Sequence, residues 1–379
     1  MAISTITSNS IADGAVTSSD LATGAVEQAM TTQIGGRRNL IINGAMQVAQ
    51  RSTSEETDVG YKTVDRFRTS GSNGGGLRQQ QIALTSSDTP FASGFRNSYR
   101  MKVVTADTGA SGRFASIIYF VEAQDLANSG WDYTSTSSNL TISFWAKSSV
   151  AGTYYARFIT QDGTLYAYGH PYTLTANTWT YVTFTVTGNA NITVDNNNDK
   201  GMTIEWVLEY GTAYTDSSFV DDTWTAYNGS IRTDDFAQSW RGTTDATFEI
   251  TGVQLEVGSV ATPFEHRSYG EELALCQRYF YTCSRSGYLV GRGNGSANLA
   301  NVNMPTPVLM RTTPSISDNS GAWYAIDSDS YVNGTGATFN TITLSATHLD
   351  VQIGNLTNMT DNRFGMVFLI SGYSLDAEL

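Results

Sequence analysis

The sequence is poor in the residues that make covalent cross-links or membrane spans. It contains only two cysteines, Cys276 and Cys283, and their spacing fits neither a CxxC redox pair nor a zinc knuckle. A chain of 379 residues can bury its cores without disulfides, so we interpret both as ordinary thiols. No apolar run approaches the roughly 20 residues that cross a bilayer, and no secretion signal opens the chain. We therefore expect a soluble protein that is neither inserted in a membrane nor exported by a signal peptide.

Charged residues are also scarce. They make up 15% of the chain, against about 25% in typical soluble domains, whereas Ser, Thr, Asn, Gly and Tyr are abundant. Polar but uncharged β-rich surfaces of this kind are common in extracellular and virion proteins. The 22 basic and 35 acidic residues give a formal charge of -13, which repels phosphate backbones. The composition therefore argues against nucleic acid as a partner.

The first 38 residues contain no aromatic side chain and cannot form a core of their own. They do contain a repeat, because Ile11-Ala-Asp-Gly-Ala-Val16 returns as Leu21-Ala-Thr-Gly-Ala-Val26. Several chains side by side could bury the rows of Ile11, Val16, Leu21 and Val26 against one another, as in short-repeat β stems. A flexible tail is the alternative, since only two copies are present. Residues 1–38 are thus either an oligomerisation element or a tail.

From residue 39 to 264 the sequence is a series of alternating segments separated by Gly, Asn, Asp and Ser, as expected for half-buried antiparallel strands. The clearest segments are 140–147, 179–186 and 202–210. Many such strands without a blade repeat fit an antiparallel jelly-roll sandwich better than a propeller. We assign this sandwich to residues 39–268.

The stretch 246–264 should close that domain. Its apolar residues change phase at Gly252, which predicts a β-bulge in one strand rather than two strands. Pro263 cannot donate a ladder hydrogen bond, so the strand should end before it. A buried strand this late in a β region usually pairs with an early one, and 39–48 is the obvious partner.

The pattern of residues 269–379 predicts a helix followed by more strands. Residues 271–281 have helical spacing, so we predict a connector helix within residues 269–284. Three of the six prolines follow, at Pro305, Pro307 and Pro314, which is typical of an edge strand or an extended crossing. Alternation then returns and predicts a smaller C-terminal β domain over residues 285–379. The expected fold class is all-β.

The two ends of the β region resemble a known family. Asn39-Leu-Ile-Ile-Asn-Gly44 and Val253-Gln-Leu-Glu256 resemble jelly-roll carbohydrate-binding modules, which begin near NLIxNG and end near VQLE. The continuation, Leu275-Cys-Gln-Arg-Tyr-Phe280 and the terminal Asp376-Ala-Glu-Leu379, resembles a recurrent family of tailed-phage tail fibres and tail-associated proteins. The Asp13-Gly-Ala-Val16 repeat is similar to the virion-attachment segments of such fibres.

The resemblance implies a virion tail protein that residues 1–38 attach to tail, adaptor or nozzle proteins. It would bind a host surface glycan or receptor without cleaving it, and be extracellular after release. The repeat and the C-terminal domain together predict a homotrimer. A structural virion protein with no ligand is the alternative, and a glycan depolymerase is the third hypothesis.

Motifs for catalysis or metal binding are weak, and we predict neither an enzyme nor a resident cofactor. The three histidines are scattered, without the spacing of a zinc site. Residues 195–199 imitate the start of a calcium loop, but Lys200 and Trp206 stand where that loop needs Gly and Glu. We expect an Asx-rich turn there, with calcium between jelly-roll loops left open. The acid pairs Asp221-Asp222 and Asp234-Asp235 should point apart into solvent.

The aromatic residues carry the better functional signal, because sugar C–H faces stack on displayed rings. Trp145 falls on the face opposite Leu140, Ile142 and Phe144, although Trp145, Trp179 and Trp206 are each more often core residues in a sandwich. Residues in polar, loop-like surroundings are the preferred candidates for glycan contact. They are Tyr166, Tyr168, Tyr172 and Trp224.

Overall fold

The computed structural model describes residues 38–57, 59–72, 76–109, 111–283, 287–293, 300–318, 323–327, 330–334, 339–344, 348–353, 364–369 and 373–379. The chain divides into two units, 1–38 and 39–379. The repeat residues Ile11, Val16, Leu21 and Val26 lie outside the described residues.

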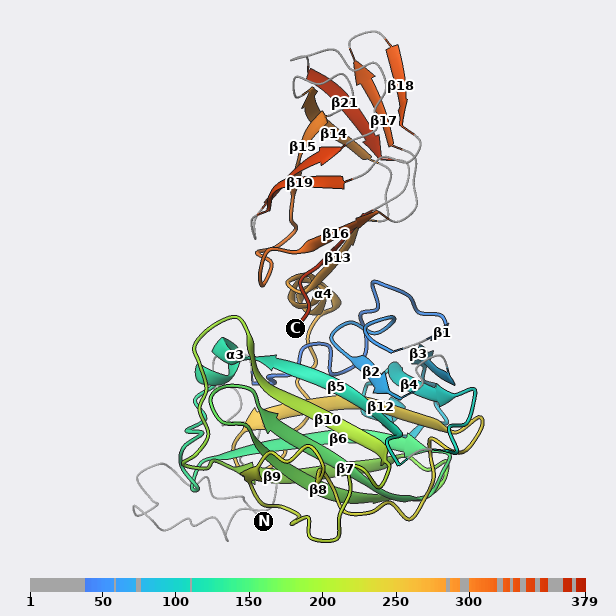
Figure 1. The fold of residues 1–379 in the computed structure, drawn as a ribbon, viewed down its shortest axis with the longest axis vertical. Coiled ribbons are helices and arrows are strands. Elements are labelled where there is room, and N and C mark those ends of the chain that lie inside the picture. Colours follow the sequence, from blue (N-terminus) through green and yellow to red (C-terminus); the bar gives the residue numbers. More distant parts are fainter. Residues whose placement is uncertain are drawn as a thin grey trace, which may run out of the picture. The chain divides into compact units, whose positions relative to one another are not determined.

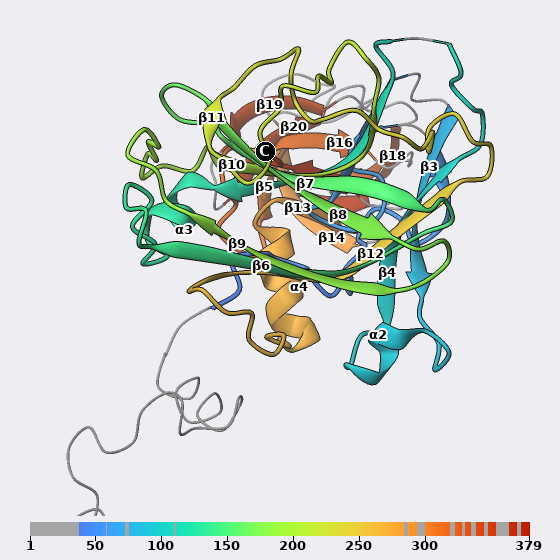
Figure 2. The ribbon, with the colours of Figure 1, turned by 90° about the horizontal axis from the view of Figure 1, so that it is seen from below.

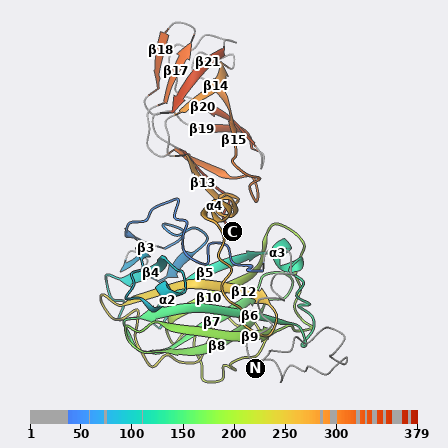
Figure 3. The same ribbon diagram turned by 180° about the vertical axis from the view of Figure 1, so that it is seen from behind.

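Two antiparallel sheets form a sandwich, as the alternation predicts, and they lie one over the other in Figure 1 and Figure 3. Sheet A has the order β1 (Glu56–Thr57), β3 (Leu77–Ala83), β4 (Asn97–Val103), β12 (Thr247–Val257), β6 (Asn139–Ser148) and β9 (Thr180–Thr187). Sheet B has the order β11 (Thr225–Ala226), β8 (Tyr166–Leu174), β7 (Gly152–Thr160), β10 (Lys200–Tyr210), β5 (Phe114–Glu122) and β2 (Arg68–Gly71). The chain crosses repeatedly between the sheets, which gives the jelly-roll topology.

Alternation along the strands places the core between the sheets. Leu140, Ile142 and Phe144 of β6 are fully buried there, and Trp206 of β10 packs its ring 5.9 Å from that of Phe144. Trp145 points to the opposite, outer face of sheet A. The two short helices of the sandwich are α2 (Thr89–Ala92), which precedes β4 in Figure 2, and α3 (Ala123–Ala127).

The segment that begins at Asn39 closes the sandwich against β12, as predicted, but as a set of turns and not as a continuous strand. The Asn39 side chain accepts from the Leu255 N–H (3.0 Å) and donates to the Val253 carbonyl (3.1 Å). Backbone bonds join Leu40 N to Leu255 O and Val253 N to Gly44 O, each at 2.9 Å. Side-chain amides thus replace part of the ladder, because the chain must turn at these residues.

The predicted bulge in β12 is confirmed. Gly252 has a φ of 64°, a left-handed value that favours glycine, and the pairing of β12 with β6 shifts register between Thr251 and Gln254. The bulge is why the inward residues change from Phe248 and Ile250 to residues 253 and 255.

The connector helix α4 (Tyr269–Gln277) begins with a capping box between Ser268 and Glu271. It is shorter than the helical spacing suggests, since β13 (Phe280–Cys283) starts three residues later. There the chain pairs with β22 (Tyr373–Asp376), which also pairs with β16 (Ser315–Asp318). Long-range strand pairing therefore overrides the local helical pattern.

A second, smaller β region follows, in agreement with the expected fold class. Its antiparallel sheet has the order β18 (Ser330–Gly334), β17 (Trp323–Asp327), β21 (Phe364–Leu369), β14 (Gly287–Gly293), β15 (Ala300–Pro305), β20 (His348–Ile353) and β19 (Phe339–Leu344). Among the described residues, no helix has the length and apolarity needed to cross a membrane.

Residues 376–379 are tied into the sandwich by two arginines, Arg66 and Arg311. Arg66, which is fully buried, donates to Glu378 Oε2 (2.5 Å) and to the Phe120 carbonyl (2.7 Å). Its guanidinium lies 3.5 Å from the centre of the Tyr279 ring. Arg311 donates to the carbonyls of Ala377 (2.8 Å) and Glu378 (3.2 Å). The last residues of the chain therefore complete the packing around α4.

Candidate functional site

The tyrosines selected from the sequence are not displayed in loops. Tyr166, Tyr168 and Tyr172 belong to β8, and Tyr168, Tyr172 and Trp224 are buried, while Tyr166 is half-buried against the core. The premise of the prediction is therefore wrong. Gly169 and Pro171 interrupt the alternation of β8, and Pro is tolerated there because this part of β8 lies at a sheet edge.

Trp224 and Tyr168 instead protect an edge strand. β9 is the last strand of sheet A, and the Trp224 indole N–H donates to the Thr187 carbonyl (2.7 Å). The Tyr168 hydroxyl donates to Asp222 (3.0 Å) and lies 3.5 Å from the Thr185 carbonyl. Capping of these carbonyls by side chains lowers the tendency of the edge to pair with another chain. We assign no ligand contact to these residues.

The outer face of sheet B is covered. Tyr155, Val207 and Tyr210 lie on that face and are buried under aromatic residues of the segment that follows β10. Rings of Phe219 and Phe236 pack edge-on against Tyr155, with centroids 6.0 and 5.8 Å away. This face therefore offers no displayed aromatic platform.

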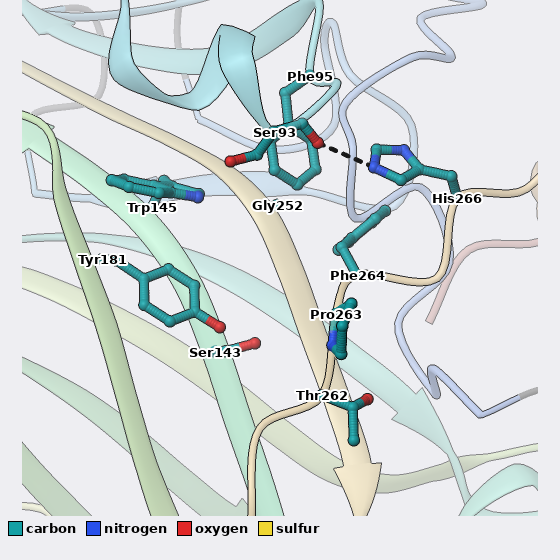
Figure 4. A pocket seen from close by; sticks show the side chains of 10 residues that line it. All are labelled: Ser93, Phe95, Ser143, Trp145, Tyr181, Gly252, Thr262, Pro263, Phe264 and His266. Carbon is teal, nitrogen blue, oxygen red and sulfur yellow. Dashed lines mark hydrogen bonds between the residues drawn. The ribbon is translucent and has the colours of Figure 1, made fainter. Parts of the chain in front are cut away.

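The outer face of sheet A holds a groove of about 520 Å³, shown in Figure 4. It is bordered by residues from the turn after α2, from β6, β9 and β12, and from the segment after β12. The lining residues are Ser93, Phe95, Ser143, Trp145, Tyr181, Gly252, Thr262, Pro263, Phe264 and His266.

One wall of the groove is an aromatic pair. Trp145 of β6 and Tyr181 of β9 are direct cross-strand partners, and their ring centroids lie 5.2 Å apart with an angle of 50° between the planes. Tyr181 is 45% exposed, which is unusual for so large a side chain in this sandwich. The pair is held by the sheet rather than by a loop, so its geometry is rigid.

The other wall is also aromatic, and its position depends on the bulge at Gly252. Phe95 contacts Phe264 and His266, with ring centroids 4.9 and 5.3 Å away. A Cβ at Gly252 would lie only 2.6 Å from the Phe95 ring, so glycine lets this ring reach the sheet. The His266 Nε2 lies 3.0 Å from the Ser93 carbonyl, which joins the segment after β12 to the turn after α2 (Figure 4).

Two buried polar residues of β12 position the segment that carries Pro263 and Phe264. Glu256 accepts hydrogen bonds from the Thr262 N–H (2.9 Å) and hydroxyl (2.5 Å). The Gln254 amide accepts from the Glu265 N–H (2.8 Å). The VQLE motif therefore has a structural role here, because its polar members hold one wall of the groove.

The turn before α2 is fixed by Asp88. Its carboxylate accepts from the Trp179 indole (2.9 Å) and the Thr85 N–H (3.0 Å) and lies 3.5 Å from the Lys147 ammonium. Although desolvation favours the neutral acid, the bonds from Thr85 and Trp179 and the charge of Lys147 lower the pKa of Asp88 to about 2. The turn that supports Ser93 and Phe95 is thus held to sheet A by an ionised group.

One acid from each pair, Asp221 and Asp234, lies near Tyr155, whereas Asp222 and Asp235 face other partners. Asp222 bonds to His170 (2.6 Å) and Tyr168, while Asp221 interacts with Tyr155. Asp235 accepts from Thr215, and Asp234 accepts from the Asp235 N–H (2.7 Å). The two acids that are adjacent in sequence therefore face different partners within each pair.

Metal ligands are not assembled in the described part of the chain, where no group of three His, Cys, Asp or Glu residues could hold an ion. In the calcium-like stretch, Asn197 Oδ1 accepts from the Asp199 N–H (2.9 Å), which is the hydrogen bond of an Asx turn.

Neither models of protein families nor curated proteins match the sequence. Among solved structures, the chain is similar to the enzymatically active domain of bacteriophage CBA120 tailspike protein 4, at 13% identity over 58% of this chain and 21% of that chain, with a TM-score of 0.32. It is also similar to a family 11 carbohydrate-binding module from Clostridium thermocellum (11% identity, 56% and 99% covered, TM-score 0.27). A xylan-binding domain from Paenibacillus barcinonensis gives 9% identity, 56% and 98% covered, and a TM-score of 0.26. These likenesses concern the fold alone.

Proposed function

We propose that this protein binds a host glycan in the groove of sheet A without cleaving it. The observation that carries the proposal is the rigid cross-strand pair of the half-buried Trp145 and the exposed Tyr181 in the groove. Sugar rings have a C–H face that stacks on aromatic rings, and sugar-binding sites combine such rings with a few hydroxyl groups. Tyr181, which is exposed, carries a hydroxyl here, while the Ser143 side chain is almost fully buried and the Thr262 hydroxyl, which donates to Glu256, can only accept from a ligand.

Binding at a single groove should be weak. Stacking contributes only about 1 kcal/mol per ring beyond the buried area, so one site has low affinity. Several identical sites on one particle raise the avidity by about 10²- to 10⁴-fold without new contacts. A low-affinity groove therefore suits a protein that is present in several copies.

The central test compares two tyrosine substitutions in the full chain on a glycan array. Tyr181→Ala should weaken retention about tenfold, since it removes one stacking partner worth roughly 1–1.5 kcal/mol. Tyr269→Ala is the matched control, because Tyr269 is 57% exposed but lies on α4 outside the groove. It should leave retention unchanged.

Two outcomes would count against the proposal. Equal retention of the Tyr181 and Tyr269 variants would remove the groove as the binding site. Shortened oligosaccharides after incubation would move the protein to the depolymerase class.

We further propose that the protein belongs to a phage tail, where it is a homotrimer held by residues 1–38. The support is the sequence resemblance of the Asp13-Gly-Ala-Val16 repeat and of residues 275–280 and 376–379. A virion protein without a ligand remains the second candidate, favoured by the covering of sheet B.

Deletion of residues 1–38 tests the attachment role. The shortened protein should keep its β structure and its glycan retention at high protein density, but should no longer assemble onto virions. Sedimentation of the full chain should give a trimer. Normal virion occupancy of the shortened protein, or a full-length monomer at micromolar concentration, would contradict this part.

A further inference from the structure

The groove contains no fixed charge. None of its ten lining residues is Asp, Glu, Lys or Arg, and His266 is the one histidine among them. The His266 ring packs at an angle against Phe95 and edge-on against Phe264, with Nε2 beside the Ser93 carbonyl. A ligand in the groove therefore contacts aromatic rings and hydroxyl groups, and none of the lining residues offers it an ion pair.

Two of the cations near the groove walls, Lys147 and Arg100, are paired with carboxylates, whereas the exposed Arg96 beside Phe95 donates to the carbonyls of Phe91 (3.0 Å) and Phe95 (2.8 Å). The Lys147 ammonium lies 3.5 Å from Asp88 and 3.4 Å from Glu249. Arg100 donates to the same Glu249 carboxylate (2.8 Å). Glu256 accepts from Thr262 and from Gln254 (2.8 Å). Lys147 and Arg100 are therefore already engaged by carboxylates and do not balance a charge on a ligand beside Trp145 and Tyr181.

An anionic sugar would be disfavoured for two physical reasons. Its carboxylate would lose water beside Trp145 and Tyr181 without gaining a counter-ion, and it would face the negative faces of the rings. The formal charge of -13 on the chain adds a repulsion at longer range. An uncharged sugar meets neither cost.

We propose that the groove selects uncharged sugars and rejects those that carry a carboxylate, such as uronic and sialic acids. This inference rests on the proposed glycan binding and names the class of its ligand. The selectivity comes from the absence of a cation among the lining residues, so one cation added beside the Trp145 and Tyr181 wall should relax it.

Thr183 is the position at which to add that cation. It is exposed on β9 and is the direct cross-strand partner of Ser143, which lines the groove. It lies two residues from Tyr181, on the same face of the strand. Thr183→Lys places an ammonium at the rim, and Thr183→Gln is a matched uncharged control of similar length.

The experiment uses the full chain and matched pairs of polysaccharides. Neutral glucans, galactans and mannans are each compared with the same polymer after oxidation of its C6 hydroxyls to carboxylates. For a polymer that the wild type retains, oxidation should weaken binding roughly tenfold or more. Thr183→Lys should recover most of that loss at low salt but not at about 1 M salt, where the Debye length falls to about 3 Å. Thr183→Gln should recover none of it.

The outcomes separate this inference from the proposed function. Wild-type binding that is equal for the neutral and oxidised polymers, or stronger for the oxidised ones, overturns the selectivity but leaves glycan binding intact. Equal effects of Thr183→Lys and Thr183→Gln overturn the assignment of selectivity to the uncharged lining. Retention of no polymer overturns the proposed function and the inference with it.

Discussion

Replacing Glu378 with alanine should lower the free energy of unfolding by about 3–5 kcal/mol, the cost of leaving one member of a buried ion pair without its partner. Arg66 is fully buried, and Glu378 Oε2 lies 2.5 Å from its Nη1. Arg51 lies 3.4 Å from the other carboxylate oxygen of Glu378. Removal of the carboxylate would take this partner away from both the Arg66 and the Arg51 guanidinium groups, of which the first is buried and the second nearly so. Urea unfolding of the full chain, followed by tryptophan emission, measures the change.

A surface ion pair provides the control for this experiment. Asp245 lies 2.9 Å from Lys102, but its side chain is 73% exposed. Asp245→Asn should therefore cost less than about 1 kcal/mol. If Glu378→Ala cost no more than this control, residues 376–379 would not complete the packing of the sandwich.

Gly44→Ala should destabilise the sandwich by at least about 3 kcal/mol, because the new Cβ would meet a backbone atom that cannot move aside. It would lie 2.0 Å from the carbonyl oxygen of Val253. Relief of this clash requires breaking the bond from Val253 N to Gly44 O (2.9 Å). Since Gly252 and the groove follow from the path of β12, we also expect weaker glycan retention in this variant.

Gly270→Ala is the matched control for Gly44→Ala. Gly270 lies in α4, and a Cβ there would meet nothing within 4 Å. Alanine in a helix should stabilise the protein by up to about 1 kcal/mol. Similar thermal unfolding of the Gly44 and Gly270 variants would contradict the closure of the sandwich by its two ends.

The features that were predictable from the sequence depend on periodicity along one strand. The change of phase at Gly252 revealed the bulge, and the alternation of residues 140–145 placed Trp145 on the face opposite the core. Both follow from local geometry, in which successive side chains point to opposite faces.

The features that were missed depend on which strands become neighbours. Tyr181 forms a platform only because its strand pairs with β6 in the register that places it beside Trp145. Trp224 and Tyr168 are buried because they cap the carbonyls of β9, which are distant in sequence. Periodicity within a segment contains no information on these long-range partners.

The most direct test of the central claim is a saturation-transfer NMR measurement on the full chain with a glycan that the wild type retains. The signal reports which ligand protons touch the protein. We predict the strongest transfer to the C–H protons of one sugar face, with that pattern lost in Tyr181→Ala and kept in Tyr269→Ala. The same pattern in both variants would contradict stacking on Trp145 and Tyr181 as the basis of binding.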